Sequence, residues 1–555
     1  MKKFLPIILL LILISSFKAS AQISQGGLPP SFKTTLSAAD IDNIILPSPD
    51  MQAVAAQDEE YLKTARPYRI GINIPVNATM ENSGTWTDLP NHSGKIWRLK
   101  LHSAGASGLN IRFEDFFMPT GSKFYIYNES HTHVLGAFTE VNNNDDGSFA
   151  TEVLQGETAI LEYFQPSDVQ AKARMALSNV AYIYRGMESY LKAIAGSGSC
   201  EVNIACSEGT NWQDEKKGVL LIETVISGGT FLCSGSVMNN TKGDCTPYVL
   251  LADHCSYDAA YASAADMNTW VFYFHYEATT CTGTAPSGVK SMTGCTLKAH
   301  DTYGSNNSGS DFYLVQLKTA IPASNNAYFN GWSRSTSPSS SGVGIHHPAG
   351  DIKKISTYTS ALTSISVGGT GSHWEVTWAA TTNGHGVTEG GSSGSPLFNS
   401  AGLVIGTLTG GTSYCTTPND PDYYGKFAQH WTSNGTTSAK QLKPWLDPLN
   451  TNPTTLNGTY SCTSSIDETK KSETGISVYP NPTRGAVTVD FGAPVKGTAI
   501  FTVNDILGQQ VRTIESGSAL STTLTIDLSG LKGGIYFIGI TVDNRTVTRK
   551  VILQD

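Results

Sequence analysis

The 555-residue chain has few charged side chains and no concentrated run of either sign. Charged residues make up 15% of it, whereas an average protein has about 25%. The 37 lysine and arginine residues, set against 46 aspartate and glutamate residues, give a net charge of −9. An acidic chain without a basic block argues against nucleic acid as a partner.

Two motifs of metal and redox chemistry are also missing. The sequence has no CxxC pair and no HExxH, so it indicates neither a zinc site nor dithiol redox chemistry, and we expect no metal or cofactor. Hydrophobic residues still reach 39%, which is enough for folded cores and excludes a wholly disordered chain. With 54 glycines and many serine and threonine residues, the composition is typical of a secreted, largely β protein.

Long apolar runs are absent except for one short stretch at the N-terminus. Lys2 and Lys3 precede an apolar run at 4–14, and Ala19-Ser20-Ala21 follows it. The run is too short for a bilayer span, which needs about 20 residues. The pattern predicts a signal peptide over residues 1–21, a new N-terminus at Gln22, and export.

Export makes disulfide bonds between the cysteines possible, because an oxidising compartment allows them. Eight of the nine fall between residues 200 and 415, and Cys462 lies outside this range. Eight cysteines allow 105 pairings, so spacing alone leaves the connectivity open. The eight mark one domain: Cys200, Cys206, Cys233, Cys245, Cys255, Cys281, Cys295 and Cys415.

Several domains are expected from the length, at roughly 150 residues each. Residues 22–67 are polar, with no convincing core. From 68 to about 165, short alternating runs such as 95–101 and 122–128 predict a small antiparallel β-domain. The composition of 168–195 favours a helix.

Turn signals and short strands fill residues 200–435, and a short helix is expected at 438–446. Residues 462–475 have the polar composition of a linker. Short strands with tight turns then predict a β-sandwich over 476–555.

Three segments of the cysteine-rich region carry candidate chemistry. An apolar strand delivers His254 beside a cysteine, Asp311 opens another apolar strand, and Ser393 lies in the glycine-rich turn EGGSSGSP. Each feature alone is common in purely structural settings. The order His, Asp, Ser within one exported domain is the order of chymotrypsin-type proteases.

Each residue type suits a step of acyl transfer. A serine hydroxyl is a poor nucleophile, so His254 would take its proton and pass it to the leaving amine. Asp311 would fix the imidazole tautomer and stabilise the imidazolium. Backbone N–H groups of Gly391 and Ser393 would form an oxyanion hole, in which one donor is worth about 2.7–4 kcal/mol.

Residues 195–461 resemble the lysyl endopeptidases, a bacterial branch of the trypsin-like serine proteases. The resemblance implies His254, Asp311 and Ser393 as the triad, and Cys200–Cys415, Cys206–Cys281 and Cys233–Cys255 as disulfides. Cys245 and Cys295 have no counterparts in the family, and we expect them to form a fourth bridge that leaves Cys462 unpaired. The segments that carry the resemblance are SGSCEVNIAC (197–206), CSGSVMNN (233–240), TPYVLLADHC (246–255), GSDFYLVQL (309–317), GIHHPAGDIKKIS (344–356), GVTEGGSSGSP (386–396) and WLDP (445–448).

The same resemblance implies a lysine-binding pocket. Trypsin carries its pocket aspartate six residues before the nucleophile, where this chain has Val387. Lysyl endopeptidases use an Asp-x-Tyr-Gly context, which here begins at Asp422, with Asp420 as the alternative. A buried carboxylate at the base of a pocket would select a cation.

Two departures from the family put strict lysine preference in doubt. Its histidine before Gly-Gly is Thr409 here, in Thr409-Gly410-Gly411, and its stacking tryptophan is missing from 366–369. Arginine is therefore kept as a second substrate. His346 and His347, in the matching IHHP segment, are interpreted as structural, and His275 as a packed or surface residue.

Activation is expected to differ from that of trypsin. In trypsin-like zymogens the new N-terminus pairs with an aspartate before the nucleophile, and that position is Ser392 here. We expect residues 22–192 to be a pro-region that assists folding and blocks the cleft. Cleavage after Lys192 would release a protease domain over 193–461 that begins at Ala193.

The last 80 residues resemble the C-terminal sorting domain of type IX secretion in Bacteroidetes. The carrying motifs are Val478-Tyr479-Pro480-Asn481-Pro482, Asn504-Asp505-Ile506-Leu507-Gly508 and Gly533-Gly534-Ile535-Tyr536. The resemblance implies contact with the secretion machinery, passage through the periplasm, and release or surface attachment. A carbohydrate-binding or adhesive module is the alternative.

The prediction as a whole is an all-β chain. It combines a two-barrel trypsin-like serine protease with an N-terminal β pro-domain and a C-terminal β-sandwich sorting domain. The expected function is a secreted, monomeric serine endopeptidase that cuts protein or peptide substrates after lysine, and also after arginine if the pocket admits it. The alternatives are a protease of other preference and a catalytically silent surface adhesin with a protease fold.

Overall fold

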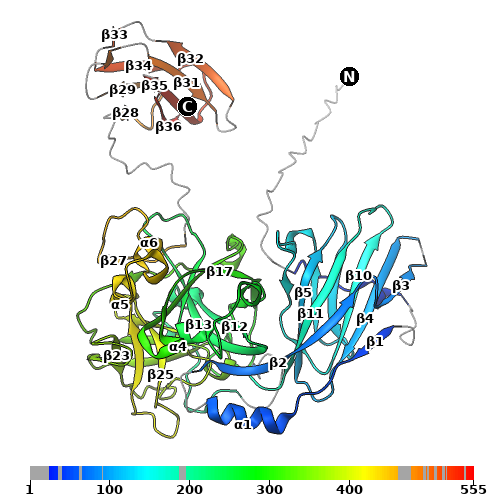
Figure 1. Cartoon of the computed structure of the whole chain (residues 1–555). Coiled ribbons are helices and arrows are strands. Elements are labelled where there is room, and N and C mark those ends of the chain that lie inside the picture. The colour runs from blue at the N-terminus through cyan, green and yellow to red at the C-terminus, as the bar shows by residue number, and fades with distance from the viewer. Residues whose placement is uncertain are drawn as a thin grey trace, which may run out of the picture. The chain divides into compact units, whose positions relative to one another are not determined.

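The computed structural model divides the chain into two compact units, Met1–Thr463 and Ser464–Asp555 (Figure 1). It describes residues 24–34, 41–61, 66–90, 92–186, 196–460, 477–491, 495–496, 499–505, 509–515, 519–520, 522–542 and 545–554. The predicted signal peptide, Lys192, Cys462 and the predicted linker lie outside these ranges. Within them, no helix is long and apolar enough to cross a bilayer.

The first unit begins with a β-sandwich over 24–186, called here the N-terminal domain. One of its sheets has the strand order β1-β4-β10-β6-β7, and β3 pairs with β4. The strands of this sheet are β1 (Asp42–Ile45), β3 (Thr85–Asp88), β4 (Gly94–His102), β6 (Lys123–Asn128), β7 (Val134–Phe138) and β10 (Thr158–Pro166). β4 and β6 confirm the two strands predicted from alternating residues, because such alternation places every second side chain in the core.

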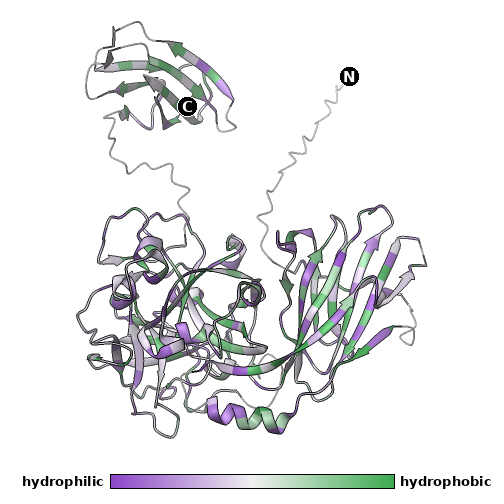
Figure 2. Ribbon diagram, viewed as in Figure 1, coloured by the Kyte–Doolittle hydropathy of each residue, from purple (hydrophilic) through white to green (hydrophobic). Residues whose placement is uncertain are grey.

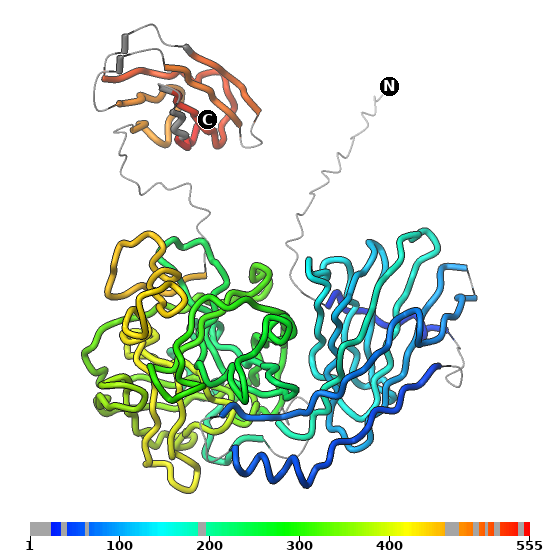
Figure 3. Tube along the Cα trace, in the orientation of Figure 1, coloured from blue at the N-terminus to red at the C-terminus, as the bar shows by residue number. Residues whose placement is uncertain are grey.

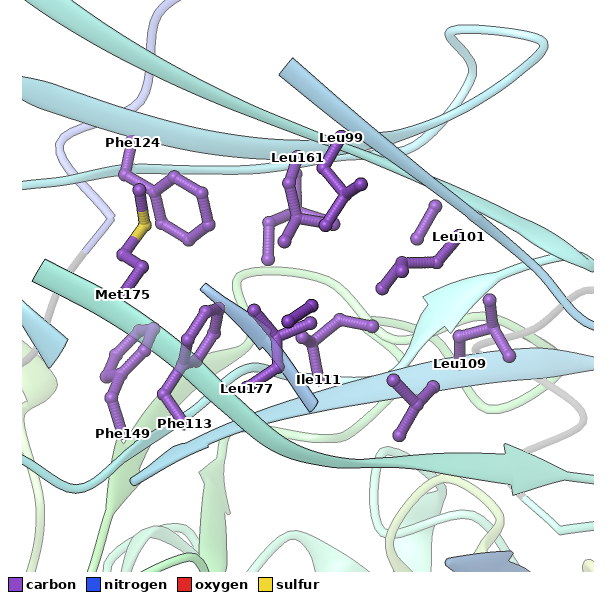
Figure 4. Close-up of a cluster of buried hydrophobic side chains, with 14 of the residues drawn as sticks. Leu99, Leu101, Leu109, Ile111, Phe113, Phe124, Phe149, Leu161, Met175 and Leu177 are labelled. Carbon is purple, nitrogen blue, oxygen red and sulfur yellow. The ribbon is translucent and has the colours of Figure 1, made fainter. Parts of the chain in front are cut away.

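The second sheet of this domain contains β2-β11-β5-β8, with β9 beside β5. Its strands are β2 (Tyr68–Thr79), β5 (Gly108–Phe117), β8 (Phe149–Ala150), β9 (Leu154–Gln155) and β11 (Arg174–Ile183). An apolar core rich in phenylalanine fills the space between the two sheets (Figure 4). Figure 2 shows hydrophobic and hydrophilic residues alternating along these strands.

The helix predicted at 168–195 is wrong over 168–186, and its remaining residues lie outside the described ranges. Residues 174–183 form β11, which pairs with β2 on one side and β5 on the other. Two sheet neighbours and the burial of Met175, Leu177 and Val180 outweigh local helix propensity. Conversely, the polar segment before residue 68 contains the helix α1 (Met51–Tyr61), which buries only Val54 and Asp58.

Residues 196–460, called here the protease region, begin with strands that continue the second sheet. The order β16-β15-β12-β13-β2 joins the two domains, and β13 also pairs with β14, β14 with β18, and β18 with β17. The strands are β12 (Val219–Ile226), β13 (Gly229–Met238), β14 (Tyr248–Leu251), β15 (Val271–Phe274), β16 (Lys290–Thr293), β17 (Cys295–Thr302) and β18 (Ser308–Leu317). Figures 1 and 3 show β2 entering the protease region from the N-terminal domain.

A nine-stranded sheet forms the second half of the protease region, in the order β21-β20-β24-β25-β26-β23-β22 with β19 and β27 at its side. The predicted all-β, two-barrel class is confirmed. The strands are β19 (Trp332–Ser333), β20 (Gly342–His346), β21 (Lys354–Tyr358), β22 (Thr363–Ile365), β23 (His373–Val376), β24 (Pro396–Asn399), β25 (Val404–Gly411), β26 (Asp422–Lys426) and β27 (Thr455–Leu456).

Helices in this region are short. They are α3 (Ala264–Met267), α4 (Tyr303–Asn306), α5 (Phe427–Thr432) and α6 (Lys443–Leu446). The helix predicted at 438–446 is present only in pieces, as a 3-10 turn at Ser438–Lys440 followed by α6. Pro444, which lacks a backbone N–H, lies in the first turn of α6 and separates the two.

Three predicted disulfides are confirmed: Cys200–Cys415, Cys206–Cys281 and Cys233–Cys255. The predicted Cys245–Cys295 bridge is wrong. Cys245 is disulfide-bonded, whereas Cys295 is a free, buried thiol. Cys295 begins β17 inside the apolar core of the first barrel, so its thiol behaves as a small hydrophobic side chain.

The second unit is a small β-structure with its own apolar core. It contains a three-stranded sheet, a two-stranded sheet and a four-stranded sheet. Its strands are β28 (Ser477–Tyr479), β29 (Ala486–Asp490), β30 (Val495–Lys496), β31 (Ala499–Asn504), β32 (Gln510–Glu515), β33 (Ala519–Leu520), β34 (Thr523–Asp527), β35 (Gly534–Val542) and β36 (Arg545–Leu553).

Candidate active site

Strand pairing brings His254 and Asp311 together. His254 lies in the turn Asp253–Ser256 directly after β14, and Asp311 lies on β18, the strand that pairs with β14. The His254 Nδ1 atom is 2.8 Å from Asp311 Oδ2, and the backbone N–H of His254 donates to Asp311 Oδ1 at 3.1 Å. Both side chains are buried, so the pair is fixed in one orientation.

The two groups shift each other's titration. Burial alone would lower the pKa of His254, but the neighbouring Asp311 carboxylate outweighs it and raises that pKa above 6.5. Burial would raise the pKa of Asp311, yet His254 and a hydrogen bond from Thr409 bring it below its usual value. The pair is therefore suited to an ionised carboxylate beside an imidazole that gains a proton readily.

Asp311 has an uncommon backbone conformation, with φ of +63°. A second buried carboxylate stabilises it: Asp301 Oδ2 accepts the N–H groups of Ser310 and Asp311, both at 2.6 Å. Burial and two nearby aspartates raise the pKa of Asp301 well above its usual value. Non-glycine residues at positive φ cluster at functional sites, where the surroundings must stabilise them.

The turn around Ser393 packs tightly against the histidine segment. Gly391 and Gly394 have φ of +97° and +80°, a region that disfavours other residues. A Cβ atom on Gly394 would lie 2.7 Å from the backbone nitrogen of Ala252. The N–H groups of Gly391 and Ser393 make no hydrogen bond to another described residue, so both can donate to an incoming oxygen.

Ser393 and His254 line one cavity of about 340 Å³. Thr409, Gly410 and Gly411 line it as well. The structure thus places Ser393, His254 and the predicted pocket strand around the same space, with Asp311 bonded to His254. Glu389, which sequence reasoning did not single out, also lines this cavity, and its Oε1 accepts the N–H of Gly198 at 2.9 Å.

Asp422 is fully buried behind the cavity wall. Its Oδ2 accepts hydrogen bonds from Trp378 Nε1, Thr388 Oγ1 and Ser413 Oγ at 2.6–2.8 Å. Its Oδ1 accepts only a long bond, 3.3 Å, from the backbone of Ser413. A Cβ on Gly411 would meet this Oδ1 at 2.0 Å, so the glycine leaves the less occupied oxygen next to the cavity. The alternative residue, Asp420, is exposed.

Burial raises the pKa of Asp422 to about 6. The hydrogen bonds to the Asp422 carboxylate all come from neutral donors, and no basic side chain contributes to the shift of its pKa. Val387, at the position of the trypsin pocket aspartate, lies in the apolar core beneath. The arrangement leaves one uncompensated carboxylate that a substrate cation could pair with.

The N-terminal domain contributes to the same cavity. Its lining includes Asp58, Tyr61, Arg66, Pro67, Tyr68, Arg69 and Arg185. The Tyr68 ring packs against Gly390, where an added Cβ would lie 2.6 Å from the ring. Arg66 forms an ion pair with Asp258, four residues after His254. Part of the cleft is therefore occupied by the chain itself.

The other histidines of interest have structural partners. His346 is buried between two hydroxyls, Ser392 Oγ at 2.8 Å and Ser356 Oγ at 3.0 Å. The Nδ1 atom of His347 bonds the backbone oxygen of Asp351 at 3.0 Å. Half-buried His275 bonds the backbone oxygen of Asn325 at 2.5 Å. Among the described residues, no group of three or more His, Cys, Asp or Glu side chains is arranged to hold a metal ion.

Comparison with known proteins finds two family matches and a related protease. Residues 194–425 match the family of the lysyl endopeptidase C-terminal domain, and residues 477–554 match a secretion system C-terminal sorting domain. A lysyl endopeptidase of Pseudomonas aeruginosa is 29% identical over 392 residues, which cover 66% of this chain and 80% of that protein.

Solved structures give more distant matches. The protease Anisep from Arthrobacter nicotinovorans is 18% identical and covers 39% of this chain and 91% of its own, with a TM-score of 0.28. A Glu endopeptidase in complex with MPD is 15% identical and covers 42% of this chain and 93% of its own, with a TM-score of 0.27.

The family match and the lysyl endopeptidase relative together show a serine endopeptidase. More particularly, the chain is a lysyl endopeptidase-like protease that carries a type IX secretion sorting domain. Its substrates are peptide bonds of proteins or peptides. The sorting domain indicates interaction with the secretion machinery and export, to the medium or the cell surface.

Proposed function

We propose that this enzyme cleaves on the carboxyl side of lysine, and of arginine where the pocket admits it, through a triad of His254, Asp311 and Ser393. The observation that carries the proposal is the cavity that joins Ser393 and His254 to the wall in front of Asp422. The family match and the neutral hydrogen-bond shell of Asp422 support the preference for a cation.

The proposed reaction passes through an acyl-enzyme. His254 removes the Ser393 proton as the hydroxyl attacks the scissile carbonyl, and then delivers it to the leaving amine. The N–H groups of Gly391 and Ser393 donate to the oxyanion, and Asp311 stabilises the imidazolium through the 2.8 Å bond. Water then enters, His254 acts as base again, and the acid product leaves.

Asp422 would set the preference by charge. A lysine ammonium that enters beside Gly411 would meet Asp422 Oδ1, the oxygen without a short bond. Ion pairing in a dry pocket favours a cation over a neutral side chain of the same length. The larger guanidinium group of arginine would have to fit within the same pocket walls. The rate of cleavage after arginine therefore depends on how far those walls can move.

We further propose that residues 22–192 form a pro-region that blocks the cleft. The ring of Tyr68 against Gly390 and the ion pair of Arg66 with Asp258 support this role, because both lie at the cavity. The pairing of β2 with β13 gives the blocking segment a fixed register. Autocatalytic cleavage after Lys192 would begin the removal.

Digestion of a denatured protein mixture by the processed enzyme tests the preference. Peptide termini read by mass spectrometry should show cuts after lysine, with arginine as a minor class. Asp422→Asn should lose most of this preference, and Ser393→Ala should make no cuts. Cuts that depend on Ser393 but fall after other residue types would keep the protease and discard Asp422. No Ser393-dependent cutting would favour the silent adhesin.

N-terminal sequencing of the processed form tests the pro-region. The expected new terminus is Ala193, and Lys192→Ala should prevent or displace the cut while Ser393 is intact. Lys217→Ala, at an exposed pair with Tyr460, is the matched control and should process normally. A mature terminus upstream of residue 100 would contradict the proposal.

A further inference from the structure

Asp258 lies four residues after His254, and both oxygens of its carboxylate are bonded to the N-terminal domain. Arg66 forms an ion pair with Oδ1, and the Tyr61 hydroxyl donates to Oδ2 at 3.1 Å. Within the described part of the protease region, no donor bonds either oxygen. We propose that Asp258 is the anionic end of a second substrate subsite, which takes an arginine or lysine side chain on the leaving-group side of the scissile bond. The inference deepens the proposed function and rests on the proposed removal of the pro-region.

A closed loop of the protease region fixes the backbone of Asp258 relative to His254. The N–H of Tyr257 donates to the backbone oxygen of His254 at 3.2 Å, and the N–H of Asp258 donates to that of Ala260 at 3.1 Å. Tyr257 and Tyr261 close the loop as an isolated β-bridge, with ring centroids 5.0 Å apart. These contacts all lie within the protease region, so they do not depend on the N-terminal domain.

Arg66 shows which ligand chemistry the carboxylate accepts. Its guanidinium pairs with Asp258 and lies over the Tyr61 ring, with Cζ 5.2 Å from the ring centroid. The Arg66 side chain is 33% exposed and that of Asp258 is 12% exposed, so water screens this ion pair less than a fully exposed one. Arg66 and Tyr61 both belong to the proposed pro-region. Its removal would open the carboxylate to a cation of the same kind from the substrate.

The place of Asp258 beside the catalytic histidine sets the side of the subsite. In the proposed reaction His254 gives its proton to the leaving amine. The part of the substrate beyond the scissile bond must therefore pass this imidazole, and Asp258 follows it in the same loop. Asp422 lies instead behind Gly411 of the pocket strand. One acid would thus serve the side chain before the cut, and the other a side chain after it.

Other acids near this loop keep their partners or leave with them. Asp253 bonds His300 Nδ1 and accepts the Tyr261 hydroxyl, both at 2.8 Å, and these partners belong to the protease region. Asp58 pairs with two arginines of its own domain and would be removed together with them. Of these three acids, only Asp258 would exchange its partner on processing.

Paired peptide substrates measure this subsite in the processed enzyme. Each peptide has a single lysine at the cut position, and arginine or citrulline at the first, second or third position after it. Citrulline has the shape of arginine without its charge, so the ratio of kcat/KM within a pair reports the charge. A ratio taken within one preparation does not depend on the fraction of active enzyme. Mass spectrometry of the products checks that the cut follows the lysine.

We expect wild type to favour the arginine peptide by about 3- to 5-fold at one of these positions, the upper part of the range for exposed ion pairs. The ratio should fall in high salt. Asp258→Asn should bring it to about 1, and Asp258→Glu should keep part of it. Neither variant should change the preference for lysine before the cut. Asp214→Asn, at an exposed acid outside the cavity lining, is the matched control and should keep the wild-type ratio.

A ratio near 1 in wild type at all three positions, or one that Asp258→Asn leaves unchanged, would overturn the inference. Should Asp258→Asn fail to fold, Asp258→Ser takes its place, and loss of the wild-type ratio in high salt is a second reading. N-terminal sequencing that finds Arg66 still present in the active enzyme would overturn the pro-region proposal and the subsite together. An intact arginine ratio without a preference for lysine before the cut would support the subsite and contradict the role of Asp422.

Discussion

The N-terminal domain and the protease region fill their interiors with different chemistry. No cysteine precedes Cys200 in the sequence, and the sandwich core is a cluster of phenylalanines in which Phe116 and Phe149 stack at 4.3 Å. The protease region has three described disulfides, and it buries charged and titratable groups such as Asp301, His254 and Asp422.

The difference shows what an active site costs in stability. Buried carboxylates with raised pKa values, such as Asp301 and Asp422, are unfavourable unless the surroundings compensate. Disulfides constrain the unfolded chain and offset that cost. The N-terminal domain also buries charged side chains such as Arg112 and Glu162, but apolar packing makes up most of its core. Changes to the two regions should therefore affect different measurements.

The largest expected effect falls on activity alone. Asp311→Asn should lower kcat about 10⁴-fold, as loss of the orienting carboxylate does in other triads, with the thermal midpoint nearly unchanged. In wild type the raised pKa of His254 means that kcat/KM falls as pH drops through a value above 6.5. Removal of the Asp311 charge should move this acid limb to lower pH. An unmoved limb would show that Asp311 is not its cause.

A core change in the N-terminal domain should act on stability alone. Phe113→Ala removes a ring packed among Phe116, Phe124 and Phe149, and should lower the free energy of unfolding by about 3–5 kcal/mol. Urea unfolding of the full chain in the Ser393→Ala background, where self-cleavage is absent, measures it. Phe113→Leu is the matched control, at under about 1.5 kcal/mol. A loss of less than about 1.5 kcal/mol for Phe113→Ala would contradict the packing account.

The pocket should show a pH dependence of its own. Since the pKa of Asp422 is raised to about 6, its carboxylate takes up a proton as pH falls through that value, and KM for a lysine substrate should rise there. Asp422→Asn should lower kcat/KM for that substrate by about 100-fold, equivalent to about 2.7 kcal/mol, and abolish the dependence. An ester with a neutral side chain serves as the comparison substrate and should lack the effect in both enzymes.

The smallest effect is expected at the surface of the N-terminal domain. Arg174 and Asp115 form an ion pair of 3.0 Å whose side chains are 56% and 45% exposed. Asp115→Asn should lower the free energy of unfolding by less than about 1 kcal/mol, and less still in high salt. Urea titrations at two salt concentrations measure this. A loss comparable to that of Phe113→Ala would contradict the packing account.

Much of the fold could be predicted, because strong alternation marks strands such as β4 and β6. The errors fall where local pattern and tertiary setting disagree. Residues 174–183 are composed like a helix but have sheet neighbours on both sides. Helix α1 has no apolar face, with only Val54 and Asp58 buried, so periodicity could not reveal it.

The candidate site likewise contains residues that the sequence predicts and features that it does not. His254, Asp311 and Ser393 lie in motifs whose order is itself informative; the structure places His254 and Ser393 at one cavity and Asp311 beside His254. Glu389 also lines this cavity, but it has no place in the order of the motifs, so the sequence did not single it out. The failed Cys245–Cys295 pairing has a similar cause, since proximity to the triad segments says nothing of which thiols meet.

Active-site labelling tests the central claim most directly. The processed wild-type enzyme would be treated with diisopropyl fluorophosphate at pH 8, digested, and mapped by mass spectrometry. The account predicts one adduct per molecule, on Ser393, with loss of peptidase activity in proportion to labelling, and no adduct in His254→Ala. Full inactivation with the adduct on another residue, or active enzyme with Ser393 fully labelled, would contradict it.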